Sequence, residues 1–115
     1  MTDQSRAEMI TNFLTHLSDE RQLSQHTVKG YRRDLVALSE YLEPLAIDSW
    51  CEVASHHLRG FISAGHRDGR SGRTLQRRLS AYRTFFNYLA REGLTTTNPA
   101  MEFSAPKSKA RLPTT

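Results

Sequence analysis

Arginine dominates the stretch of the chain from Arg67 to Arg91, which reads RDGRSGRTLQRRLSAYRTFFNYLAR. It holds seven arginines and a single acid, Asp68. The arginines crowd its first half, whereas its second half is aromatic and apolar. Because a planar guanidinium can make paired hydrogen bonds to phosphate oxygens, such a segment could anchor one face in a core and offer the other to an anion. A phosphate backbone is the partner that this pattern favours.

The candidate contact residues lie where a helix is expected to begin. They are Arg70, Ser71, Arg73, Thr74, Arg77 and Arg78. Arg73 and Arg77 are four residues apart and project together, away from the apolar stripe. Arg78 lies nearer the apolar edge and could instead pair with an acid or with a second surface. The free amides and positive dipole end of a helix start also favour an anion, and a major groove is wide enough to admit one helix.

A solvated charged face is the alternative interpretation of these arginines. Exposed helix faces usually mix both signs of charge, but no acid occurs between Gly69 and Ala90. The sequence therefore favours nucleic acid over simple solvation.

A second, weaker patch of the same kind lies further towards the N-terminus. Its members are Ser24, Gln25, Thr27, Lys29 and Arg32. Steps of four and three residues align Gln25, Lys29 and Arg32 on one helix flank. Ordinary solvation, or pairing with Glu40 or Asp34, is the alternative for the two cations. Two capped helix starts of this type could grip one duplex from two sides.

No residue constellation in this sequence predicts catalysis, a metal or a cofactor. His56 and His57 are adjacent, so on a helix they point about 100° apart and cannot easily share one ion. Cys51 is the only cysteine, which excludes an internal disulfide. The serines lack the nucleophile-elbow pattern, and no glycine-rich phosphate loop is present. We expect no catalytic residue and no small-molecule ligand in this chain.

The bulk composition agrees with a small basic protein. The 115 residues suffice for one modest core, the formal net charge is +4 and the isoelectric point is about 9.6. Arginine supplies thirteen of the sixteen basic residues, although a GC-rich genome would explain this bias equally well. No apolar run approaches the ~20 residues that span a membrane, and no signal sequence is evident. We expect a cytoplasmic protein that does not contact membranes.

Hydrophobic spacing predicts four long helices and no convincing strand. They are expected at residues 5–20, 24–43, 55–67 and 72–92, with apolar stripes at three- and four-residue steps. The expected inward residues are Met9, Ile10, Phe13, Leu14, Leu17, Val28, Tyr31, Leu35, Leu38, Leu42, Leu58, Phe61, Ile62, Leu75, Leu79, Tyr82, Phe86 and Leu89. Ser24 caps the second helix, Ser71 or Gly72 caps the fourth, and Gly93 stops it. Trp50 is expected to be a lid on the core.

The C-terminal part predicts a short last helix and then a linker. Asn98-Pro99 begins a helix expected over residues 99–103. The fold is therefore all-α, a compact bundle of four long helices plus a short C-terminal one, in a domain over residues 1–103. Residues 104–115 read as an extended basic linker, in which Lys107 and Lys109 are further candidates for contacts with DNA.

Several segments in register resemble the N-terminal core-binding (SAM-like) domain of bacterial tyrosine recombinases of the Xer type, and the XerC branch most closely. They are FLTHLSDERQLS at residues 13–24, LSQHTVKGYRRDL at 23–35, SGRTLQRRLSAYRTFFNYLAREG at 71–93, NPA at 98–100 and APKSKARLP at 105–113. Together they cover nearly the whole chain from Phe13 onward. The chain departs from the family at Tyr82, where an apolar residue such as leucine commonly precedes the arginine.

The resemblance implies a domain that clamps one face of a DNA half-site with two helices in the major groove, while a larger C-terminal domain cuts and rejoins strands. The residues carried over are Thr27, Lys29, Tyr31, Arg32, Arg73, Thr74, Arg77 and Arg78. Tyr31 also falls on an apolar stripe, so packing explains it first. The implied partners are a double-stranded recombination site and a XerD-like recombinase, and the implied role is resolution of chromosome dimers at cell division. The catalytic set is absent from this sequence, so we expect it in a longer parent protein.

Two rival functions stay open at this point. One is an all-α interaction module whose arginine-rich face docks on an acidic protein. The other is a regulator of the helix-turn-helix type, against which the long last helix and the basic tail argue.

Overall fold

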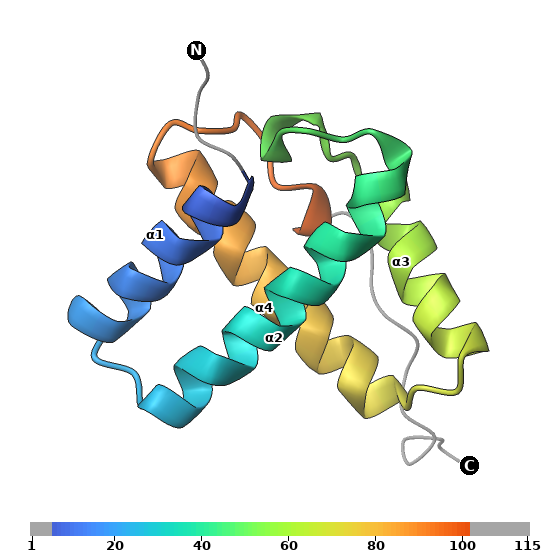
Figure 1. The fold of residues 1–115 in the computed structure, drawn as a ribbon, viewed down its shortest axis with the longest axis horizontal. Helices are drawn as coiled ribbons and strands as arrows, with labels where there is room; N and C mark the ends of the chain where they lie inside the picture. Colours follow the sequence, from blue (N-terminus) through green and yellow to red (C-terminus); the bar gives the residue numbers. More distant parts are fainter. Residues whose placement is uncertain (1–5, 102–115) are drawn as a thin grey trace. The chain divides into compact units, whose positions relative to one another are not determined.

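The computed structural model describes residues 6–101, which form helices and contain no strand (Figure 1). The elements are α1 (Arg6–Asp19), α2 (Gln25–Leu42), η1 (Glu43–Leu45), η2 (Trp50–Glu52), α3 (Ser55–Arg67), α4 (Gly72–Arg91) and η3 (Pro99–Met101). The all-α prediction is confirmed, and each long helix ends within one or two residues of its expected bounds. Of the expected last helix, the described part is the single 3₁₀ turn η3, and residues 102 and 103 lie outside the described range. Among residues 6–101, no helix has the length and apolar character needed to cross a membrane.

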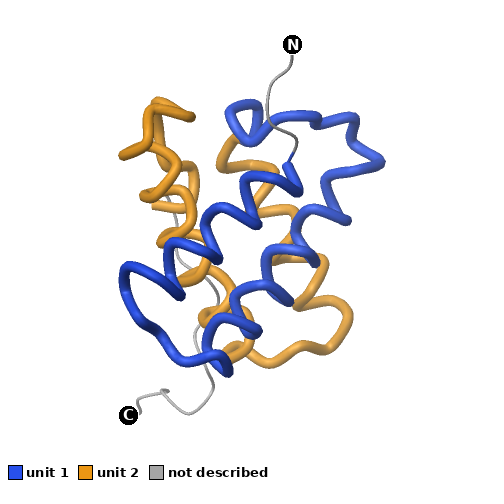
Figure 2. The backbone as a smooth tube through the Cα atoms, turned by 60° about the vertical axis from the view of Figure 1, so that its left-hand side comes forward, with its two compact units in different colours: residues 1–53 blue, residues 54–115 orange. Residues whose placement is uncertain are grey.

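The chain divides into two compact units between Val53 and Ala54 (Figure 2). In the first unit α1 packs against α2, and the predicted apolar stripe of α1 is entirely buried. On α2 the residues Leu35, Leu38 and Leu42 are buried, whereas Val28 and Tyr31 are only half-buried. The Tyr31 ring meets the Phe13 ring edge-on, with 5.7 Å between centroids. Burial along α2 is thus greatest from Leu35 to Leu42.

Arg6 ties three segments of the first unit together. Its guanidinium donates to the Ser39 carbonyl at 2.9 Å and forms an ion pair with Glu43. Its own carbonyl accepts a hydrogen bond from the indole nitrogen of Trp50 at 3.2 Å. Trp50, expected as a lid on the core, is 1% exposed and lies within the core itself. The start of α1 is therefore fixed to the end of α2 and to η2.

In the second unit α3 packs against α4 through complementary apolar faces. The predicted inward residues of both helices are buried, and Ala81 and Phe85 join them. A Cβ added at Gly65 would come within 2.9 Å of Leu75 Cδ2, so the glycine lets the two helices approach closely. Tyr82 is fully buried, with its ring centroid 6.0 Å from that of Phe61. The tyrosine that departs from the family pattern at this position is therefore a core residue.

Glycines in the left-handed conformation end both helices of this unit. Gly69 has φ +92° and Gly93 has φ +78°. At each end a later amide bonds back to the helix, Arg70 N to Gly65 O at 3.0 Å and Leu94 N to Leu89 O at 2.8 Å. This is the Schellman pattern, and it confirms Gly93 as the stop of α4.

Arg83 holds η3 against α4. Its Nε donates to the Ala100 carbonyl at 3.0 Å, and its own carbonyl accepts from Asn98 Nδ2 at 3.1 Å. The Asn98 amide also donates to Asn87 Oδ1 at 3.0 Å, and its oxygen accepts from Ala100 N at 3.0 Å. This arginine of the Arg67–Arg91 stretch therefore has a structural role inside the unit.

His57 caps the start of α3. Its Nδ1 accepts a hydrogen bond from the Ala54 amide at 2.9 Å, which requires an unprotonated Nδ1. Burial lowers the pKa of His57, and the neighbouring His56 ring, 4.1 Å away between centroids, lowers it further. The folded state therefore favours the neutral imidazole.

The buried α4 stripe predicts the outcome of a core substitution. Phe86 is fully buried, so Phe86→Ala should lower the free energy of unfolding by roughly 3–5 kcal/mol. Urea denaturation of the 115-residue chain measures this loss. Ser80→Ala, on the exposed side of the same helix, should change it by less than about 0.5 kcal/mol. An unchanged urea midpoint in Phe86→Ala would show that this ring is not in the core.

The His57 cap predicts a loss of stability in acid. Since the pKa of His57 is lower in the folded than in the unfolded chain, its contribution is complete above about pH 6.5 and decreases as the pH falls below that value. In His57→Gln the amide oxygen can keep the cap without titrating, so the difference in unfolding free energy between about pH 7.5 and about pH 5.5 should shrink. His26→Gln, at an exposed position on α2, is the control. An equal acid-induced loss in wild type and His57→Gln would contradict this role.

Candidate nucleic-acid interface

Serine caps fix the starts of α2 and α4 in the same way. Ser71 has φ −70° and ψ 157°, and its Oγ accepts from Thr74 N at 3.1 Å while donating to Thr74 Oγ1 at 3.1 Å. Ser24 has φ −65° and ψ 157°. Its Oγ likewise accepts from Thr27 N and donates to Thr27 Oγ1, each at 3.1 Å. Both predicted caps are confirmed, and Ser71 rather than Gly72 is the cap of α4. Each threonine hydroxyl oxygen also accepts a hydrogen bond from the serine that caps its helix.

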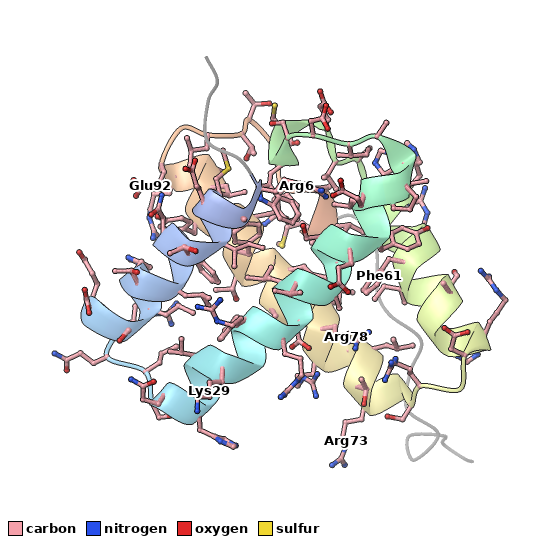
Figure 3. All side chains as sticks on the ribbon, viewed as in Figure 1. Arg6, Lys29, Phe61, Arg73, Arg78 and Glu92 are labelled. Atoms are coloured by element: carbon pink, nitrogen blue, oxygen red, sulfur yellow. The ribbon has the colours of Figure 1, made fainter. Side chains whose placement is uncertain are left out.

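Acidic residues are missing from the first turn of both helices. The positive end of each helix dipole therefore keeps its full attraction for an anion. At the start of α4, Arg70, Arg73 and Arg77 are exposed. Figure 3 shows Arg73 extending away from the helix. We name Arg70, Ser71, Arg73, Thr74 and Arg77 the α4 cationic face.

Arg78 differs from the other arginines of this helix start. It is half-buried, and its guanidinium carbon lies 5.7 Å from the centroid of the Phe61 ring on α3 (Figure 3). That distance permits a cation–π contact. The structure therefore places Arg78 against the neighbouring helix of its own unit, as the apolar-edge position suggested, rather than beside Arg73.

The predicted contact residues on and before α2 are exposed, apart from Tyr31. Ser24, Gln25, Thr27, Lys29 and Arg32 are all exposed. Tyr31 is half-buried against Phe13, which agrees with packing as its first role. Asp34, expected as a possible surface partner of these cations, is 2% exposed and lies among the buried residues.

Two of the predicted residues, Lys107 and Lys109, lie outside the described range. Arg91 is at the far end of α4, ~27 Å along the helix axis from Arg73. Within residues 6–101, no group of three or more His, Cys, Asp or Glu side chains is arranged to hold a metal ion. What the two helix starts offer is a set of cationic and hydroxyl donors suited to phosphate oxygens.

Comparison with known proteins gives the family. Residues 10–93 match the model of the phage integrase N-terminal SAM-like domain. The tyrosine recombinase XerC of Alcanivorax borkumensis is 49% identical over 106 residues, which are 92% of this chain and 34% of that protein. XerC of Azotobacter vinelandii is 47% identical over 103 residues, again covering 34% of its length. The chain thus spans about a third of these relatives.

Solved structures share the fold at 19% identity. The N-terminal domain of a phage integrase/site-specific recombinase from Haloarcula marismortui has a TM-score of 0.80, with 92% of this chain and all of that one covered. A lambda integrase dimer bound to a COC′ core site has a TM-score of 0.79, and the match covers 94% of this chain and 36% of that one. By its fold and by a family match over most of its length, the chain belongs to the phage integrase N-terminal SAM-like domains, and it is similar to the matching part of tyrosine recombinases named XerC.

Proposed function

We propose that this chain is the DNA-binding domain of a XerC-like tyrosine recombinase and grips one half-site of a recombination sequence. The observation that carries the proposal is the α4 cationic face, in which exposed arginines surround a serine-capped helix start without an acid in its first turn. Family membership supports it, since the relatives of this chain are named recombinases and a protein of the same fold is bound to a core site.

The proposed contacts are divided between phosphates and bases. Arg73 and Arg77 leave one side of α4 four residues apart, so both can reach one groove and its rim. Ser71 and the first-turn amides favour a phosphate at the helix end. On α2, Lys29 and Arg32 supply a second set of cations at a helix start of the same geometry. The domain then contributes affinity and register, without itself cutting a strand.

The proposal assigns the chemical steps of recombination to a longer protein that contains this domain. Strand cleavage and rejoining would be the work of a C-terminal catalytic domain, reached through a basic linker over residues 104–115 that follows a DNA-binding domain over residues 1–103. Pairing with a XerD-like recombinase and resolution of chromosome dimers in the bacterial cytoplasm complete the proposal. An arginine face that docks on an acidic protein is the competing function, and the following experiment separates the two.

Loss of either exposed arginine should weaken duplex binding. Arg73→Ala and Arg77→Ala should each raise the Kd and, where the side chain touches phosphate, make the slope of log K against log salt shallower by about 1. Fluorescence anisotropy across a salt titration measures both quantities. Arg91→Ala removes the same charge at the other end of α4 and should leave binding nearly unchanged.

Circular dichroism of each variant checks that the fold is retained. The proposal fails if both variants bind duplex as wild type does at every salt concentration. It also fails if the wild-type chain prefers polyglutamate to duplex DNA, which is the result expected of a module that docks on acidic proteins.

A further inference from the structure

The outer face of α3 is a second cationic surface of the same unit. His56, Arg59, Ser63, His66 and Arg67 are all exposed. Steps of three and four residues connect His56, Arg59 and Ser63, and Ser63 is followed at the same steps by both His66 and Arg67, so the five share one side of the helix. The helix contains no acid, and from Ser55 to Arg91 the sequence has eight arginines and one acid, Asp68. We name these five residues the α3 outer face.

Packing fixes the direction in which this face points. Leu58, Phe61, Ile62 and Gly65 are buried on the opposite side of α3, and the Gly65 backbone lies close against Leu75 of α4. The helix cannot rotate to bury its cations without exposing this apolar side. The α3 outer face is therefore held away from α4 by the core itself.

A tight turn connects the helices that carry the two cationic surfaces. The turn holds Gly69 at φ +92° and returns the Arg70 amide to the Gly65 carbonyl at 3.0 Å. The end of α3 and the start of α4 are consequently joined at one corner, which Figure 1 shows. Arg67, Arg70 and Arg73 succeed one another every three residues across this corner. The chain thus carries exposed cations on both sides of this corner and within the turn.

We infer that the α3 outer face binds the sugar–phosphate backbone of duplex DNA that flanks the segment contacted by α4. The inference rests on the proposed function, because it uses DNA already held at the start of α4. Arg59 and Arg67 are separated by ~12 Å along the helix axis, a length over which one DNA strand presents about three phosphates. Arginine, histidine and serine donors on a convex helix suit phosphate oxygens, and their contacts would carry no sequence information.

The test compares a short and a long duplex. One is about one helical turn long (~10 bp) and the other about three turns (~30 bp) with the same central sequence. The double variant Arg59→Gln/Arg67→Gln should bind the short duplex as wild type does. On the long duplex its slope of log K against log salt should be shallower than that of wild type by about 2, at about 0.9 for each phosphate contact. Arg91→Gln, a single charge removed from the far end of α4, should follow wild type on both.

A charge-preserving variant separates the loss of charge from a loss of fold. Arg59→Lys/Arg67→Lys should keep most of the wild-type slope on the long duplex, since each lysine still neutralises a phosphate. The inference is overturned if the glutamine double variant matches wild type on the long duplex while Arg73→Ala weakens binding to both duplexes. It is equally overturned if the glutamine variant loses slope to the same extent on both duplexes. If Arg73→Ala also matches wild type throughout, the proposed function itself has failed.

Discussion

The buried stripe of α4 is the constraint on which the rest of the second unit depends. Leu75, Leu79, Tyr82, Phe86 and Leu89 are each at most 1% exposed. Once these side chains occupy the core, the helix has no rotational freedom, and the positions of its arginines are determined. Arg73 and Arg77 then face solvent, Arg78 falls at the edge over Phe61, and Arg83 is directed to η3. One side of α4 thereby forms the core, while its other side carries the exposed arginines.

Two helix starts of identical construction extend this arrangement. Ser24 and Thr27 on α2 reproduce the hydrogen bonds of Ser71 and Thr74 on α4, and neither first turn carries an acid. A side-chain cap contributes about 1 kcal/mol to a helix and sets its first turn in place. Rigid starts matter for binding, because donors that are already ordered lose less entropy when they meet a phosphate. The two units thus present cations in the same local geometry.

Local signals in the sequence predicted most of the fold. Apolar spacing located the four long helices, and the serines and Gly93 predicted their ends, because caps and stripes depend on neighbours a few residues away. The exposed arginines of α4 followed from the same spacing. What the sequence did not predict are contacts between distant residues. Arg6 meets Ser39 and Glu43, and nothing near Arg6 in the chain announces those partners.

Two further residues show the same limit. Asp34 looked like a surface acid among cations, yet it is buried. His57 was considered only as a metal ligand, whereas it accepts a hydrogen bond from the Ala54 amide at the start of α3. Each depends on tertiary surroundings or on a helix boundary set by packing. The separation of the exposed arginines from Arg78 and Arg83, which contact other parts of the unit, likewise required the positions of Phe61 and Ala100.

The central claim is that the exposed helix starts, rather than the chain as a whole, meet DNA. Amide chemical shifts of the ¹⁵N-labelled chain, recorded while a duplex is added, test it most directly. The account predicts that the largest shifts occur at Ser71 to Arg78 and at Ser24 to Arg32, with little change along α1 or at the end of α4. Shifts concentrated on α1 or on the C-terminal turns of α4, with the helix starts unchanged, would contradict it.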